Sequence, residues 1–161
     1  MDYNKYMKIA YSQAKKALKI DEVPIGCVIV WEDEEGEKIL ARGYNRRVKD
    51  KNVLKHAEII AINRACKKIG DWRLDKAVMF VTIEPCPMCA GALLQTRIKK
   101  VVFGARNPKA GCVGSIYNLL DEDRFNHKAE ILEGVMEKEC ASLMTEFFRE
   151  FRNRKVKKSD G

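Results

Sequence analysis

The chain has 161 residues, and 46% of them are hydrophobic, which predicts one globular domain with a sizeable core. No run of about 18 apolar residues is present that could span a bilayer, so we expect no membrane partner. Residues 1–19 are amphipathic with scattered lysines, unlike a secretory signal peptide, and we expect a cytoplasmic protein. The formal net charge of +8 suits a polyanionic partner such as nucleic acid without requiring one.

Hydrophobic periodicity predicts a layered α/β domain. The expected helices cover 3–18, 58–69, 86–96 and a long final stretch that begins at 136. The expected strands cover 25–31, 38–44, 77–83, 100–105 and 129–133. The strand–helix–strand units imply partly parallel pairing with right-handed crossovers. We therefore expect a single α/β/α domain over residues 1–161, with a basic helix end at about 149–161.

Two short segments carry the chemistry, His56-Ala57-Glu58 and Pro85-Cys86-Pro87-Met88-Cys89. Zinc binds imidazole nitrogen and thiolate sulfur, and a catalytic zinc keeps three protein ligands and a fourth position open to water. His56, Cys86 and Cys89 supply three such ligands, which leaves Glu58 free to move protons. The combination H-x-E…P-C-x-x-C is typical of zinc deaminases.

The spacing of these residues restricts where the two helices can begin. Two cysteines three apart at a helix start lie on one face, and Pro87 fits the first turn because its missing N–H forfeits no helical bond. On a regular helix, however, His56 and Glu58 would point about 200° apart. They can address one site only if His56 lies at the very beginning of its helix.

Other interpretations of the same residues stay open. A structural zinc site needs four protein ligands, and Cys27, Cys66 or Cys112 is available as the fourth. A CxxC redox pair would leave His56 without a role, although such a pair more naturally follows a strand in a thioredoxin-like unit. The cysteines outside the motif sit singly among apolar or small residues, which predicts reduced, buried thiols and no disulfide framework.

Given these motifs, the sequence resembles the bacterial tRNA-specific adenosine deaminases, the TadA family of the cytidine deaminase fold. The resemblance runs from about Val23 to Arg149 and includes Val-Val-Phe-Gly-Ala-Arg at 101–106 and Phe-Phe-Arg at 147–149, which point to the tRNA branch. It implies a three-layer α/β/α fold with a five-stranded mixed sheet, a homodimer and one zinc ion per subunit. The implied reaction converts adenosine to inosine, releasing ammonia, at the wobble position of an arginine tRNA anticodon.

The resemblance also implies roles for individual residues. Four match the zinc ligands and the proton-transferring carboxylate: His56, Cys86, Cys89 and Glu58. Asn45 matches an asparagine that hydrogen-bonds the target nucleoside, and Val23 and the Ala57 backbone would lie against the base. The residues expected to contact the rest of the anticodon stem-loop are Arg106, Asn107, Lys109, Phe148 and Arg149.

Asn107 departs from the family pattern, in which many members carry aspartate at this position. The amide keeps the size and one acceptor but loses the charge and adds a donor. A carboxylate here would repel nearby phosphate while selecting a hydroxyl partner. We therefore predict that this protein discriminates RNA from DNA less sharply than its relatives.

Residues 149–158 carry six basic side chains and one acidic side chain. This run predicts contact with RNA phosphates, with Phe148 and Phe151 anchoring the helix beneath it; the alternative is a solvated, fraying helix end.

Two rival functions also remain. A free nucleobase or nucleoside deaminase would share the zinc motif but bind a small substrate, with little dependence on salt. A zinc-stabilised RNA-binding protein without catalysis would hold its metal with four protein ligands.

Overall fold

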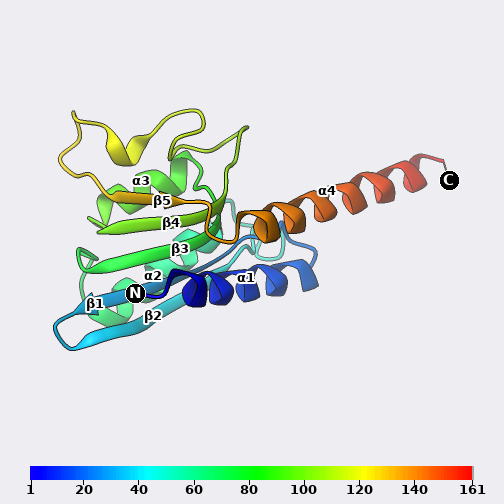
Figure 1. Cartoon of the computed structure of the whole chain (residues 1–161). Coiled ribbons are helices and arrows are strands. Elements are labelled where there is room, and N and C mark those ends of the chain that lie inside the picture. The colour runs from blue at the N-terminus through cyan, green and yellow to red at the C-terminus, as the bar shows by residue number, and fades with distance from the viewer. Residues whose placement is uncertain (161) are drawn as a thin grey trace.

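The computed structural model describes residues 1–160, which form one five-stranded sheet with helices on both faces (Figure 1). The strands are β1 (Gly26–Asp33), β2 (Gly36–Tyr44), β3 (Ala77–Ile83), β4 (Lys100–Ala105) and β5 (Glu130–Glu133). Their spatial order is β2-β1-β3-β4-β5. Strand β1 pairs antiparallel with β2 and β3, whereas β3, β4 and β5 pair parallel, so the sheet is mixed, as predicted.

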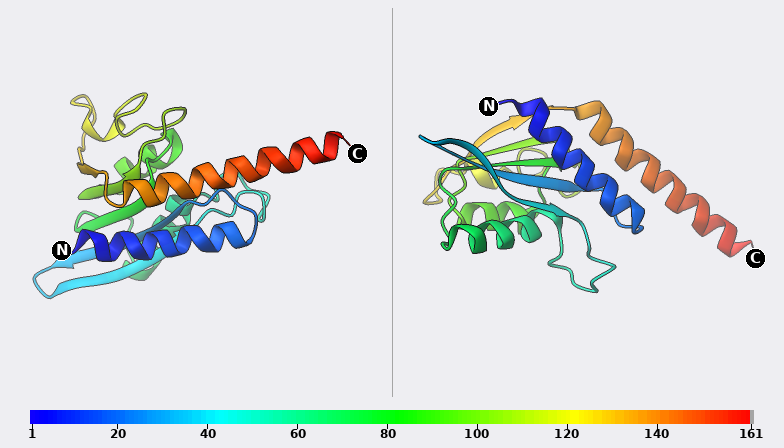
Figure 2. Two further views of the ribbon diagram at one scale, coloured as in Figure 1. Left: turned by 45° about the vertical axis from the view of Figure 1, so that its right-hand side comes forward. Right: turned by 90° about the horizontal axis from the view of Figure 1, so that it is seen from below.

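The helices divide between the two faces of this sheet (Figure 2). They are α1 (Tyr3–Lys19), α2 (Ala57–Ile69), α3 (Pro87–Gln95) and α4 (Glu137–Ser159), with one 3-10 turn, η1 (Leu119–Asp121). Helices α1 and α4 cover one face, and α2 and α3 cover the other. Strand β3 is buried along its length: Val78 and Phe80 pack toward the first face, and Met79 and Val81 toward the second. The predicted three-layer α/β/α architecture is confirmed.

The predicted elements end within two residues of the observed ones. The largest differences are at the first hairpin, where β1 and β2 keep pairing as far as Asp33 and Gly36, so β1 ends two residues later and β2 begins two residues earlier than expected. Within residues 1–160, no helix combines the length and apolar composition needed to cross a membrane.

Helix α4 continues well past the end of the sheet (Figure 2). Phe147 is its last buried residue, at 6% exposure, and residues 148–160 are all exposed. The prediction that Phe148 and Phe151 anchor this helix is therefore wrong. Phe147 is the anchor, and the rings of Phe148 and Phe151 lie against it at centroid distances of 5.3 and 6.3 Å. One ion pair, from Arg154 to Asp21 at 3.2 Å, joins the projecting part to the end of α1.

Candidate active site

The first wall of the site is the start of α2. His56 is the N-cap residue of this helix, with an extended backbone (φ −76°, ψ 153°), and Glu58 lies in the first helical turn. Because an N-cap residue lies outside the regular helical rotation, the 200° separation expected within a helix does not apply. The condition that His56 lie at the very beginning of its helix is therefore met, and this explains how residues two apart can serve one site.

A close contact with the sheet fixes the position of this helix start. A Cβ atom built on Gly43 of β2 would lie only 2.3 Å from the carbonyl oxygen of Ala57, so no larger residue fits here without moving the helix. The thiol of Cys27, on β1, donates a hydrogen bond to the same oxygen at 3.1 Å. Both contacts place the backbone between His56 and Glu58 directly against the sheet.

The second wall is the start of α3, which follows β3 after a short turn. Cys86 is the N-cap residue of α3 (φ −73°, ψ 175°), and Pro87 occupies the first helical turn. Cys89 lies one turn further and is fully buried. The proline fits because the N–H that it lacks would have no helical partner at that position.

The two helix starts bring together three metal-ligating atoms. The Nδ1 atom of His56 lies 3.6 Å from Cys86 Sγ and 3.5 Å from Cys89 Sγ. With Zn–N and Zn–S bonds of about 2.0 and 2.3 Å, tetrahedral zinc requires N···S separations of about 3.5 Å. The donor set and its spacing therefore fit a zinc ion. The three atoms form the one such group found within residues 1–160, and Cys27, Cys66 and Cys112 do not extend it to a four-ligand structural site.

The ligands influence one another's protonation before any metal binds. A hydrogen bond from the Cys89 thiol, helped by His56, holds the pKa of Cys86 well below its usual value, at about 4. The same contact raises the pKa of Cys89. The hydrogen bond with Cys86 raises the pKa of His56. One sulfur is thus a thiolate at neutral pH in the absence of metal, which favours capture of a cation.

Glu58 lies beside this group and is 3% exposed. Its burial raises the pKa of the carboxyl group, since burial disfavours the charged form. A cavity opens next to it. The residues that line this cavity are Val23, Ile25, Asn45, Arg47, His56, Ala57 and Glu58. His56, which belongs to the group of three metal-ligating atoms, and the buried carboxylate of Glu58 therefore lie on the wall of the same cavity.

Asn45, at the end of β2, contributes a polar group to this cavity. Its Nδ2 atom donates to Glu22 Oε2 and to the Val23 carbonyl oxygen, both at 3.4 Å. Its Oδ1 atom is buried and is the one buried side-chain nitrogen or oxygen within residues 1–160 that has no hydrogen-bond partner. An unpaired buried oxygen is costly unless a ligand or water completes it.

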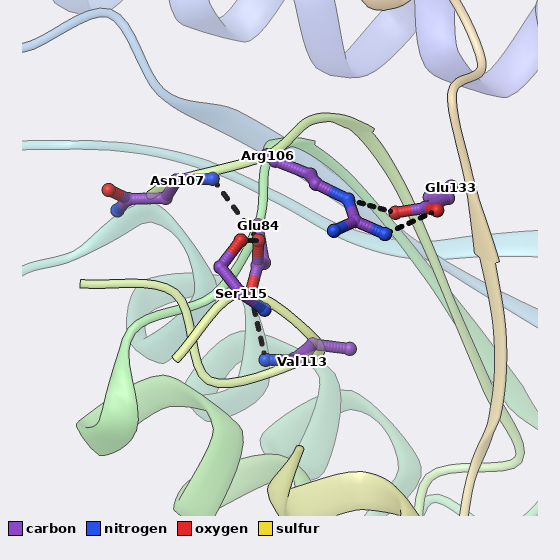
Figure 3. A network of polar contacts seen from close by, with 6 residues as sticks. All are labelled: Glu84, Arg106, Asn107, Val113, Ser115 and Glu133. Carbon is purple, nitrogen blue, oxygen red and sulfur yellow. Dashed lines mark hydrogen bonds and ion pairs between the residues drawn. The ribbon is translucent and has the colours of Figure 1, made fainter. Parts of the chain in front are cut away.

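The residues expected to contact the rest of the anticodon lie outside this cavity. Arg106 and Lys109 are exposed on the loop after β4, and Phe148 and Arg149 are exposed on α4. The guanidinium of Arg106 makes a two-point contact with the Glu133 carboxylate, through Nε and Nη2, each at 2.8 Å (Figure 3). The Nε and Nη2 groups of Arg106 are therefore already paired within the chain.

The backbone of the loop after β4 is held by Glu84, two residues before Cys86 (Figure 3). The buried carboxylate accepts from the N–H groups of Asn107, Val113 and Ser115 at 3.1, 3.0 and 3.0 Å, and from the Ser115 hydroxyl. Burial raises its pKa, but these hydrogen bonds outweigh burial and leave the pKa below the usual value. A Cβ on Gly111 would meet the same carboxyl group at 2.3 Å, so the loop wraps closely around it.

Sequence reasoning missed several residues of the site and its surroundings. Ile25 and Arg47 line the cavity, and the only signal in the sequence was their closeness to Val23 and Asn45.

His127, in contrast, lies apart from the ligand group, and its Nε2 donates to the Ile98 carbonyl oxygen at 2.7 Å. It is a structural contact of the segment before β5.

The comparisons with known proteins agree with this geometry. The sequence model of the MafB19-like deaminases matches residues 1–152. A tRNA-specific adenosine deaminase of Bacillus subtilis (strain 168) is 51% identical over 150 residues, which are 93% of this chain and 91% of that protein. The corresponding protein of Haemophilus influenzae (strain Rd) is 38% identical over 151 residues, 94% of this chain and 86% of that protein.

Solved structures show the same fold. One comes from studies of A-to-I editing by tRNA:A34 deaminases at the wobble position of transfer RNA. Its sequence is 37% identical to this chain and its TM-score is 0.80; the match covers 86% of this chain and 98% of that chain. A guanine deaminase of Nitrosomonas europaea shares the fold at 21% identity and a TM-score of 0.75, over 89% of this chain and 83% of that chain. The chain belongs to the MafB19-like deaminases and to the family of tRNA-specific adenosine deaminases.

Proposed function

We propose that this protein hydrolyses adenosine to inosine at the wobble position of a tRNA anticodon, with an arginine tRNA as the expected substrate and ammonia as the second product. The proposal is supported by the family and by the chemistry of the site. The observation that carries it is the position of Glu58, a buried carboxylate on the same cavity wall as His56, beside a group of three zinc-ligating atoms. We extend it to one zinc ion per chain and to one deaminase domain over residues 1–161.

His56, Cys86 and Cys89 are the residues that would hold the metal. A zinc ion there supplies Lewis acidity, which makes water acidic enough to be activated near neutral pH. Glu58 takes a proton from the water that attacks C6 of adenine. It gives this proton to N1 of the ring. It then takes the proton of the new C6 hydroxyl group and passes it to the amino group, so that ammonia departs and the C6 carbonyl of inosine remains. Its raised pKa suits a group that must both accept and donate a proton.

The cavity is lined by apolar side chains and by the polar group of Asn45, which suits a single unstacked base. An adenine paired within a duplex cannot reach such a site, so the substrate must be flipped out or single-stranded. An anticodon loop presents splayed bases in this way. We propose that Asn45 binds the target nucleoside and that Val23 and the Ala57 backbone pack against its base, while Arg106, Asn107, Lys109, Phe148 and Arg149 face the rest of the stem-loop.

The excess of positive charge supports a nucleic-acid substrate. The exposed end of α4 carries Arg149, Arg152, Arg154, Lys155, Lys157 and Lys158. These side chains would contact phosphates of the tRNA, which explains why an α-helix projects from the body of the protein with no core beneath it. We also propose that the protein acts as a homodimer, as the family resemblance implies, which light scattering of the purified protein would test.

The decisive experiment measures inosine directly. The zinc-loaded protein is incubated with an unmodified arginine tRNA transcript, and the RNA is then digested to oligonucleotides that are sequenced by mass spectrometry. We expect inosine at the wobble position of the anticodon fragment and an equal amount of ammonia. Free guanine, adenosine and cytidine are assayed in parallel. Deamination of one of these with no inosine in the tRNA would replace the proposal by a free nucleobase or nucleoside deaminase, and the absence of any ammonia release would indicate an RNA-binding protein without catalysis.

A further inference from the structure

Glu22 is a buried acidic residue that the catalytic scheme does not use. It lies in the turn after α1, directly before Val23, and is 1% exposed. Its two carboxylate oxygens serve different partners. Oε1 accepts from the backbone N–H of Lys49 at 2.6 Å, and Oε2 accepts from Asn45 Nδ2 at 3.4 Å. One side chain therefore contacts both a cavity residue and the loop that leads from β2 to His56.

The contact with Glu22 determines which end of the Asn45 amide is free. A carboxylate can only accept hydrogen bonds, and so can the Val23 carbonyl oxygen. Both face the same end of the Asn45 side chain, at 3.4 Å, and that end must therefore be the NH₂ group. The amide oxygen is left buried and without a partner at the cavity. If the amide turned over, its oxygen would face two acceptors, which is unfavourable.

The loop contact adds a second constraint. Lys49 lies between Asn45 and His56, in a loop whose backbone is otherwise tied by Arg46 to Lys55 at 2.9 Å and by Asn52 to Arg47 at 3.0 Å. Glu22 is the link from this loop to the turn that carries Val23. The carboxylate thus joins the two cavity walls formed by Val23 and by Asn45, in addition to the direct contact of Asn45 Nδ2 with the Val23 carbonyl oxygen.

We propose that Glu22 is a positioning residue for the deaminase: it orients the Asn45 amide so that Oδ1 is presented to the substrate nucleoside, and it holds the loop behind Asn45. This inference rests on the proposed function, since Asn45 is taken there as a substrate contact. Glu22 touches neither the base nor the metal ligands. Its effect on the reaction passes through Asn45.

A double-mutant cycle separates this role from a purely structural one. The variants are Glu22→Gln, which keeps the size but has one acceptor instead of two, Asn45→Ala, and the double variant. We expect each single change to lower kcat/KM for the tRNA about tenfold or more, since one directed hydrogen bond is lost. We expect the double variant to lie within about twofold of Asn45→Ala, because Glu22 then has no amide to orient. Independent, multiplicative losses would overturn the proposal, as would wild-type kinetics of Glu22→Gln.

A second measurement does not depend on turnover. The side-chain ¹⁵N amide signal of Asn45 should shift in Glu22→Gln and stay in place in Glu84→Gln, a matched change of a buried carboxylate that holds the other loop. An unshifted Asn45 signal in Glu22→Gln would overturn the proposal even if the kinetics changed. Should the wild type make no inosine, the proposed function fails while this signal still decides the role of Glu22. If Glu22→Gln does not fold, Glu22→Asp, which keeps the charge but shortens the reach, takes its place in both measurements.

Discussion

The carboxylate of Glu84 accepts a hydrogen bond from the backbone N–H of Ser115 at 3.0 Å, across thirty-one residues of sequence, and so ties the end of β3 to the loop after β4. Three backbone N–H groups and one hydroxyl converge on this side chain, which has no counter-charge among them. We expect Glu84→Ala to lower the free energy of unfolding by about 3 kcal/mol, because the donors stay buried without an acceptor. Urea denaturation of the zinc-loaded protein measures this.

The control for that change is Glu84→Gln, which keeps one acceptor oxygen and should cost clearly less than Glu84→Ala. If both variants unfold at the urea concentration of the wild type, the loop is held by other contacts and Glu84 is not its anchor.

Gly43 gives a second prediction. In Gly43→Ala the new methyl group would lie 2.3 Å from the Ala57 carbonyl oxygen, so the start of α2 must move and carry His56 with it. We expect weaker zinc binding and a Tm lower by several degrees, as for a destabilisation of about 1–3 kcal/mol. Metal analysis after dialysis against a weak chelator provides the measurement. The matched control is Gly91→Ala on α3, where a Cβ meets nothing within 4 Å and zinc content should be unchanged.

Removing the metal should expose one specific thiol. Cys86 is partly exposed, whereas Cys27 and Cys112 are buried. With zinc bound, Cys86 is a ligand and should resist alkylation by iodoacetamide; after chelation it should react quickly. Peptide mass mapping distinguishes the sites, and Cys66, which is partly exposed outside the ligand group, serves as the internal standard that reacts in both states. Equal labelling of Cys86 with and without zinc would remove it from the ligand set.

Glu58→Ala should slow deamination strongly while zinc stays bound, because it removes the proposed proton carrier and Glu58 is not one of the three grouped metal-ligating residues. The expected loss in kcat is about 10²–10⁴-fold, the range for removal of a general acid–base group. Glu34→Ala, at the exposed turn between β1 and β2, is the matched control and should keep full activity. Near-normal turnover of Glu58→Ala would contradict the assignment.

The end of α4 should govern how tRNA affinity depends on salt. Truncation after Phe148 removes only exposed residues and leaves the anchor Phe147 in place, so the fold should persist. Because the deleted segment carries six basic side chains, the plot of log affinity against log salt should become less steep. Filter binding at several salt concentrations gives the slope. An unchanged slope would mean that this helix end is simply solvated.

Asn107 bears on the choice between RNA and DNA. Its side-chain Oδ1 accepts from the backbone N–H of Ala110 at 3.3 Å, a contact that an aspartate can also make. Asn107→Asp should therefore keep the loop and change only its charge. We predict a higher ratio of RNA to DNA deamination for Asn107→Asp than for the wild type, measured on matched hairpins. Identical ratios would show that this position does not discriminate.

The sequence was most informative where chemistry is local. His56, Cys86 and Cys89 could be predicted as a group because the ligand types and the Cys-x-x-Cys spacing already imply a shared ion, and the structure brings them together. The positions of the helices and strands and the partly parallel pairing followed from hydrophobic periodicity and from the strand–helix–strand units, whereas the order of the strands in the sheet came only from the structure. Asn45 was found only through the family resemblance, since a single asparagine after a strand has no distinctive pattern.

Other features could not be predicted, for physical reasons. Glu22 and Glu84 look like ordinary loop acids, because the partners that bury them are mostly backbone N–H groups, which every residue possesses. The anchor of α4 was misplaced because Phe147 and Phe148 are adjacent, and the sequence alone does not settle which one faces the core at the edge of the sheet.

Because Gly43 has no side chain, strand β2 approaches the Ala57 carbonyl oxygen closely. This approach fixes the position of the cavity wall that Ala57 forms. A different shape of this wall therefore requires a shift of strand β2 or of the start of α2, in addition to any change in the residues that line the cavity.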